Sequence, residues 1–116
     1  MVPTGRHGYG RPAHPEIDAL LRKGHERYAA LLRDFPTLSD EFVDIPLVWT
    51  DHESPFWHNG WFQGLDFVAL YCLVALRAPE RLVEIGSGNS TRLVRRAIER
   101  HGLSTHHVSI DPSPRL

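Results

Sequence analysis

The sequence predicts a small α/β protein in which N-terminal helices precede a strand–helix–strand unit. Apolar residues recur every three or four positions over residues 15–35, and a strongly apolar segment follows over residues 60–77, as expected of two helices. Residues 81–85 and 107–110 are short strand-like runs, and an amphipathic segment, residues 90–100, lies between them. Because a helix connects the two strands, we expect them to be adjacent and parallel, with a right-handed crossover.

The composition argues against several classes of protein. The chain has 116 residues and a net charge of −1, so neither nucleic acid nor an anionic membrane is indicated as a partner. Cys72 is the only cysteine, which excludes an internal disulfide. The N-terminal residues lack the apolar run of a signal peptide, and the longest apolar run, residues 67–76, is too short to cross a bilayer. We therefore expect a cytoplasmic protein.

The chain divides into three predicted regions. Residues 1–14 are rich in Gly, Pro, His and Arg without a pattern, which is typical of a disordered tail. Residues 15–78 contain the two N-terminal helices and an irregular segment between them, and residues 79–116 contain the strand–helix–strand unit. Within the irregular segment, residues 42–45 are predicted to be briefly extended, and Pro46 excludes a central strand position.

The two N-terminal helices differ in character. The first carries Gly24 on its apolar face, which indicates either the close approach of another element or a weak point. The second is predicted to be capped by Asn59 and to run to about Arg77. It is apolar nearly all round, so we expect burial on several sides, with Cys72 in the core.

The segment between the strands has an apolar and a charged face. The residues predicted to face the core are Leu93, Val94, Ala97 and Ile98. The arginines predicted to form a solvated stripe are Arg92, Arg96 and Arg100. Gly102 suits the C-terminal cap of this helix.

The stretch LVEIGSGNST, residues 82–91, places a glycine turn between a strand and a helix. Gly86 lets the chain turn sharply out of the strand, and Gly88, which lacks a Cβ, lets the backbone lie against a ligand. Glu84 precedes the first glycine by two residues, and Asp111 follows the second strand. Because ligands of such units bind beyond the carboxyl ends of the strands, we expect these residues to converge on one site.

The residue types in this turn favour one kind of nucleotide over another. Asp111 suits the hydroxyl groups of a ribose. A dinucleotide fingerprint would place its third glycine at position 91, where this chain has Thr91, and an anionic pyrophosphate has no use for Glu84. A ligand with a cationic amino group would use that carboxylate. S-adenosylmethionine combines such an amino group with a sulfonium and a ribose.

The run E-I-G-S-G-N-S-T, followed by a helix and S-I-D-P, resembles the opening of class I S-adenosylmethionine-dependent methyltransferases. The acidic residue with G-x-G matches the first motif of that family, and Asp111 matches the acidic residue that ends its second strand. The longer pattern N-G-W-F-Q-G-L-D, L-Y and P-E-R-L-V-E-I-G-S-G-N-S-T is similar to a bacterial subgroup of mostly uncharacterised methyltransferases. The resemblance covers roughly residues 42–115.

The resemblance implies S-adenosylmethionine as cofactor and a role for each motif residue. Glu84 and the two glycines would line the methionine end of the cofactor. Ser90 and Thr91 would cap the helix and touch the carboxylate of the cofactor. Asp111 would hold the ribose hydroxyls. The methyl acceptor is expected to be a small molecule or a glycan. The residues expected to bind the cofactor are Glu84, Gly86, Ser87, Gly88, Ser90, Thr91 and Asp111.

The chain departs from the family in extent. Members have a seven-stranded Rossmann-like sheet, whereas this chain ends after the second predicted strand. The adenine-contacting loop, the substrate site and the catalytic residues of the family therefore have no counterpart in it. We expect residues 79–116 to be an incomplete Rossmann-like cofactor-binding unit, part of a longer protein, and the chain alone to transfer no methyl group.

Other interpretations of the same residues stay open at this point. The chain could instead be a fragment of an NAD(P)-binding Rossmann oxidoreductase, or a non-catalytic remnant. Glu84 could simply pair with Arg81, and Asp111 could be a turn-forming residue. The eight histidines show no metal-binding spacing, so no metal site is expected. Trp57, Asn59 and Trp61 are expected to pack their loop against the core, or alternatively to line the entrance to a site.

Overall fold

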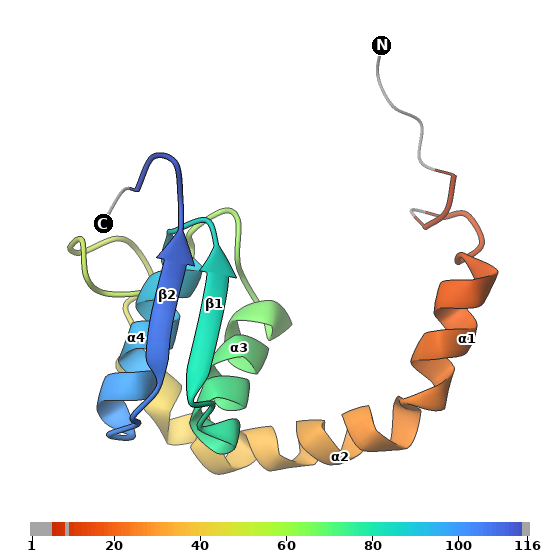
Figure 1. Ribbon diagram of the computed structural model, residues 1–116, viewed down its shortest axis with the longest axis horizontal. Helices are drawn as coiled ribbons and strands as arrows, with labels where there is room; N and C mark the ends of the chain where they lie inside the picture. Colours follow the sequence, from red (N-terminus) through yellow and green to blue (C-terminus); the bar gives the residue numbers. More distant parts are fainter. Residues whose placement is uncertain (1–5, 9, 115–116) are drawn as a thin grey trace. The chain divides into compact units, whose positions relative to one another are not determined.

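The computed structural model describes residues 6–8 and 10–114, and within them helices precede a pair of strands (Figure 1). Contacts divide the chain after Pro36 into two compact units. The described part of the predicted tail contains an isolated bridge between Gly8 and Arg11, and residues 1–5 and 9 lie outside the described residues. The elements are α1 (Pro15–Lys23), α2 (His25–Asp34), the 3-10 helix η1 (Phe35–Phe42), α3 (Leu65–Arg77), β1 (Arg81–Ile85), α4 (Asn89–Arg100) and β2 (His106–Ile110).

Gly24 divides the N-terminal helical segment, so the prediction of one continuous helix over residues 15–35 is wrong. The backbone at Gly24 has φ −92° and ψ −1°, which ends α1 and begins α2. A Cβ at this position would overlap the ring of Tyr28, one turn further along. The Tyr28 ring therefore packs directly over the backbone at Gly24, and a side chain at this position would displace that ring. The apolar periodicity continues across the break, which explains why the pattern did not reveal it.

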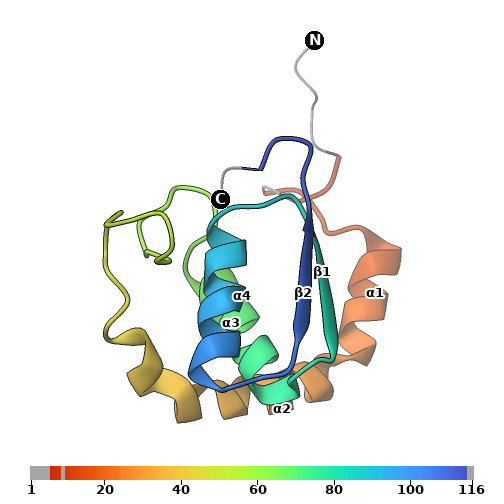
Figure 2. The ribbon, with the colours of Figure 1, turned by 60° about the vertical axis from the view of Figure 1, so that its left-hand side comes forward.

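The second unit contains the predicted parallel pair of strands. Arg81 of β1 is in register with His106 of β2, and Ile85 with Ile110, which confirms the parallel α/β prediction. Figure 2, in which the strands are seen nearly edge-on, shows α3 and α4 on the same side of the sheet. On the other face, Val83 is half exposed. The buried core residues of this unit are Ile45, Phe67, Tyr71, Val74, Leu93, Val94 and Ala97.

Helix α3 begins later and is less enclosed than the sequence predicts. Its N-cap is Gly64, which has φ +60°, so the prediction that Asn59 caps this helix is wrong. Burial on several sides is also wrong for part of its surface, because Leu65 is 62% exposed and Leu76 is 41% exposed. Cys72 is fully buried as predicted, and burial raises the pKa of its thiol to about 11.

The segment after η1 forms a turn, which corrects the prediction of an extended stretch over residues 42–45. The Ile45 amide donates to the carbonyl of Phe42 at 3.3 Å, and this bond closes the turn. The Ile45 side chain is thereby brought into the core, where it is 4% exposed.

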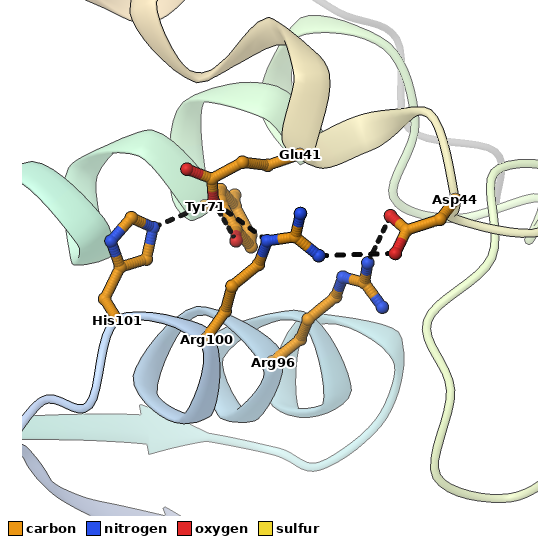
Figure 3. A network of polar contacts seen from close by, with 6 residues as sticks. All are labelled: Glu41, Asp44, Tyr71, Arg96, Arg100 and His101. Atoms are coloured by element: carbon orange, nitrogen blue, oxygen red, sulfur yellow. Dashed lines mark hydrogen bonds and ion pairs between the residues drawn. The ribbon is translucent and has the colours of Figure 1, made fainter.

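Two carboxylates near this turn form polar contacts with neighbouring elements: Glu41 connects α3 to the end of α4, and Asp44 pairs with α4 (Figure 3). Glu41 accepts a hydrogen bond from the Tyr71 hydroxyl at 2.6 Å, and the His101 Nε2 atom lies 2.8 Å from the same carboxylate oxygen. Asp44 pairs with Arg96 at 2.5 Å and with Arg100 at 3.3 Å. The prediction of a solvated arginine stripe is therefore wrong for Arg96, which is 22% exposed, whereas Arg100 is both ion-paired and exposed.

The Glu41 contacts shift the pKa values of both partners. Burial raises the pKa of the Tyr71 hydroxyl, and the neighbouring Glu41 carboxylate raises it further. Burial opposes ionisation of Glu41, but the hydrogen bonds from Tyr71 and His101 outweigh it, so the pKa of this carboxyl lies below its usual range. Glu41 is therefore ionised at neutral pH, as the acceptor of a charge-assisted hydrogen bond.

We predict that Tyr71→Phe lowers the free energy of unfolding by about 1.5–3 kcal/mol at pH 7, because it removes a hydrogen bond to a charged group. Urea unfolding measures this loss, and Tyr28→Phe on the exposed side of α2 is the matched control. Because the Glu41 pKa is depressed by folding, its contribution is complete above about pH 4.5 and is lost as the pH falls through its folded-state pKa. A loss that stays the same down to pH 3 would contradict this account of Glu41.

Candidate functional site

A cavity of about 690 Å³ opens at the carboxyl ends of the two strands, marked by the arrowheads in Figure 1. Its walls are the glycine turn between β1 and α4, the segment after β2, and an aromatic loop, residues 56–62. The volume lies within the range of small-molecule binding sites, roughly 300–1,000 Å³. Of the residues predicted to bind a cofactor, those that line the cavity are Glu84, Gly86, Ser87, Gly88, Ser90 and Asp111, whereas Thr91 does not.

The two glycines shape the wall in different ways. Gly86 has φ +99°, a backbone conformation that side chains with a Cβ rarely adopt, and its amide donates to the Ile110 carbonyl at 2.8 Å. Gly88 has an extended φ of 170°, and a Cβ built on it meets no atom within 4 Å. Gly86 is therefore required by the turn, while Gly88 keeps space open beside the backbone.

Glu84 is the most connected side chain of the site. One carboxylate oxygen accepts from the Ser90 hydroxyl, and the other accepts from Thr91 Oγ1 at 2.7 Å and from Ser109 Oγ at 3.1 Å. The His107 Nε2 atom lies 3.2 Å from that second oxygen. The side chain is 14% exposed, so these donors compensate a carboxylate that has lost most of its water. The partners come from α4 and β2, and the alternative of a pair with Arg81 is wrong.

Thr91 helps to cap the start of α4, as predicted, but its side chain bonds back to the residue that precedes the helix. Its hydroxyl accepts from the Gly88 amide at 2.9 Å and donates to Glu84. Gly88 is the N-cap residue, and a side chain at the third helical position that bonds back to it forms half of a capping box. The Ser90 hydroxyl makes no cap bond and is directed to Glu84 instead. Thr91 is thus part of the support behind the cavity wall.

Asp111 connects the end of β2 to the glycine turn. Its Oδ2 atom accepts from the Ser87 hydroxyl at 2.7 Å, and its Oδ1 atom accepts from the Ser113 amide at 2.7 Å. The second bond is the turn-forming contact expected of an Asp before a proline. The first holds the carboxylate beside the glycine turn, where it lines the cavity. The structure therefore shows the turn-forming contact and also places this carboxylate on the cavity wall.

The aromatic loop is fastened by Asn59. The Asn59 amide group donates to the carbonyls of Phe56 and Phe62, and its oxygen accepts from the amides of Trp61 and Phe62. Trp57 packs against the core, as expected. Trp61 does not, since 94% of it is exposed, and that part of the packing prediction is wrong. Trp61 instead lines the cavity, as the alternative interpretation has it.

Arg92 is the cavity residue that the sequence pattern missed. It belongs to the first turns of α4 and lines the cavity together with Glu84 and Asp111. Its Nε atom is buried without a hydrogen-bond partner, and its Nη1 atom makes one long contact, 3.4 Å, to Asn89 Oδ1. Its spacing from Arg96 and Arg100 resembles a solvent-facing stripe, and only its place next to the glycine turn distinguishes it.

Two features are absent from the part of the chain that the structure describes. Among residues 6–8 and 10–114, no group of three or more His, Cys, Asp or Glu side chains is arranged to hold a metal ion. Within the same residues, no helix has the length and apolar character needed to cross a membrane.

Comparison with protein families, curated proteins and solved structures finds no match to this chain.

We predict that Thr91→Val lowers the free energy of unfolding by about 1–3 kcal/mol, because it removes one donor to the Glu84 carboxylate and the acceptor of the Gly88 amide. Valine preserves the shape of the side chain. The matched control is Thr105→Val, because the Thr105 hydroxyl is buried without a partner and its removal should cost nothing. Equal urea midpoints for the two variants would show that the Glu84 contacts do not support the fold.

Proposed function

We propose that this chain provides the donor-binding part of an S-adenosylmethionine-dependent methyltransferase. In this proposal β1, α4 and β2 form the opening of a Rossmann-like sheet. The observation that carries the proposal is the composition of the cavity, which is lined by an open glycine turn and by two carboxylates, Asp111 bonded to Ser87 and Glu84 bonded to Ser90. A cofactor with an amino group at one end and a ribose diol at the other matches that arrangement.

The residues present fit such a ligand at each end. Asp111 already accepts a hydroxyl hydrogen bond, from Ser87, and a ribose hydroxyl would be an equivalent donor. At the other end, the Ser90 hydroxyl gives its proton to Glu84, which leaves its oxygen lone pairs as acceptors for an ammonium group. The absence of a Cβ at Gly88 leaves room between these two places.

The chain's contribution to the reaction would be binding and alignment. S-adenosylmethionine, when bound, supplies a methyl group on a sulfonium, which an acceptor attacks in line. Holding donor and acceptor in that geometry contributes much of the acceleration in such reactions. The aromatic side of the cavity, formed by Phe56 and the exposed Trp61, offers a wall along which a small-molecule or glycan acceptor would approach.

The contacts of Thr91 favour this proposal over a dinucleotide. A dinucleotide turn uses a third glycine at this position so that the helix packs closely on the strand. Here a threonine hydroxyl occupies the position and connects the turn to Glu84. Glu84 would also repel a pyrophosphate placed at the same turn, because both groups are negatively charged.

The proposal is tested by titrating the chain with S-adenosylhomocysteine and, separately, with NAD, using calorimetry or amide chemical shifts. We expect saturable binding of S-adenosylhomocysteine and none of NAD.

Asp111→Asn keeps an acceptor for the Ser113 amide but removes the charge, so the affinity for S-adenosylhomocysteine should fall about 10- to 100-fold, as for a hydrogen bond to a charged group. Asp66→Asn, at an exposed carboxylate outside the cavity, is the control and should bind normally. The proposal fails if NAD binds and S-adenosylhomocysteine does not.

A second prediction concerns Gly88. Gly88→Val should abolish binding, because its side chain would fill the space beside the turn, while the melting temperature stays within a few degrees of the original. The fold should tolerate the change because φ at this position is extended and a Cβ meets no neighbouring atom. Thermal unfolding and ligand titration of the same sample separate the two effects. Unchanged affinity in a folded Gly88→Val protein would place the ligand elsewhere.

A further inference from the structure

The arginines of α4 are not equivalent in the structure. Arg95 pairs with Glu99 at 2.8 Å, Arg96 pairs with Asp44 at 2.5 Å, and Arg100 pairs with Asp44 at 3.3 Å. Among the described residues, no carboxylate lies within ion-pair distance of Arg92. Arg92 is therefore the arginine of this helix whose charge is left without an internal counterion.

The Arg92 side chain is partly buried, which makes a charge without a counterion unusual. Its Nε atom is shielded from solvent and has no hydrogen-bond acceptor, an arrangement that costs free energy unless a further group satisfies it. Arg96 also has an unpartnered Nε atom, but its guanidinium is already neutralised by Asp44. A guanidinium that is partly buried, unpaired and on a cavity wall is suited to receive an anionic group from a ligand.

The hydroxyl groups that could otherwise donate to an anionic group of the ligand already donate to Glu84. The resemblance to methyltransferases assigned the cofactor carboxylate to the hydroxyls of Ser90 and Thr91. In the structure both hydroxyl protons are donated to Glu84, so neither is available to an anion. Among the described residues that line the cavity, Arg92 is the one whose side chain carries a positive charge.

A smaller hollow of about 160 Å³, which Arg92 also lines, is a poorer place for an anion. It is lined by Arg95 and Arg96, whose charges are matched within the chain, and by Glu53 and Glu99. An anion there would face two carboxylates and would have to compete with existing ion pairs. The larger cavity, by contrast, brings Arg92 to the same wall as Ser90 and the glycine turn.

We propose that Arg92 binds the carboxylate of the ligand's amino-acid end, while Ser90 and Glu84 face its ammonium group. Arg92 would then determine specificity for a zwitterionic ligand over one that lacks the carboxylate. This inference rests on the proposed function, since it assumes that an adenosyl amino acid occupies the cavity. It adds a residue that is neither in the glycine motif nor at the end of a strand.

The test measures the affinities of two proteins for each of two ligands. The chain and its Arg92→Gln variant are each titrated with S-adenosylhomocysteine and with its decarboxylated analogue, which keeps the amino group. The unchanged chain should bind S-adenosylhomocysteine about 10- to 100-fold more tightly than the analogue, as expected for a charge-assisted hydrogen bond. In Arg92→Gln this preference should disappear, with affinity for the analogue unchanged. Arg95→Gln, which removes an exposed arginine one turn further along, should retain the preference.

The outcomes separate the inference from the proposed function. If the unchanged chain binds neither ligand, the proposed function fails and the inference fails with it. If both ligands bind but Arg92→Gln leaves the preference intact, or weakens both ligands equally, the function stands and the role of Arg92 is wrong. Thermal unfolding adds an independent readout, because removing an unsatisfied buried Nε atom should not lower the melting temperature. A large drop would indicate a structural role instead.

Discussion

The carboxylate of Glu84 is the constraint on which the site depends. It is mostly buried, and a buried charge must be hydrogen-bonded to be tolerated. The chain meets this requirement with hydroxyls from Ser90 and Thr91 of α4 and from Ser109 of β2. One side chain of β1 thereby fixes the start of the following helix and contacts the neighbouring strand. The path of the glycine turn is set by these attachments on both of its sides.

The Glu84 contacts determine which polar groups near the cavity can donate hydrogen bonds to a ligand and which can accept them. Because the Ser90 and Thr91 hydroxyls both donate to Glu84, neither can donate to an anionic group, which must find its donor elsewhere. Asp111, at the end of β2, is held by Ser87 and by its own turn. Arg92 keeps an uncompensated charge on the same wall. The cavity therefore offers hydroxyl and carboxylate oxygens for a cation and for hydroxyl groups, and one guanidinium for an anion.

The parts of the fold that could be predicted from the sequence are those with local causes. The bounds of β1, α4 and β2 follow from the alternation of apolar runs, the glycine turn and the helical period, and the parallel register follows from the crossover. The break at Gly24 was missed because the apolar period continues through it, and the packing of the Tyr28 ring over this glycine leaves no mark on the pattern. Asn59 was assigned to a helix cap, yet it satisfies the backbone of its own loop.

The charged contacts were not predictable because their partners are distant in sequence. Arg96 is 52 residues from Asp44, and His101 is 60 residues from Glu41. A helical stripe of arginines has the same sequence pattern whether its members face water, distant carboxylates or a cavity. The structure distinguishes the three cases, and it is this distinction that identifies Arg92 as a residue of the site. Among the motif residues, Gly86 was predictable because the turn out of β1 gives it a positive φ, a conformation that favours glycine.

A crystal structure of the chain with S-adenosylhomocysteine tests the central claim most directly. The account predicts electron density for the ligand in the cavity at the carboxyl ends of β1 and β2, with both ribose hydroxyls within hydrogen-bond distance of the Asp111 carboxylate. The amino-acid end should lie against the start of α4, beside Ser90 and Arg92. Density elsewhere on the molecule, or a ribose that does not contact Asp111, would contradict the assignment of this cavity as a donor-binding site.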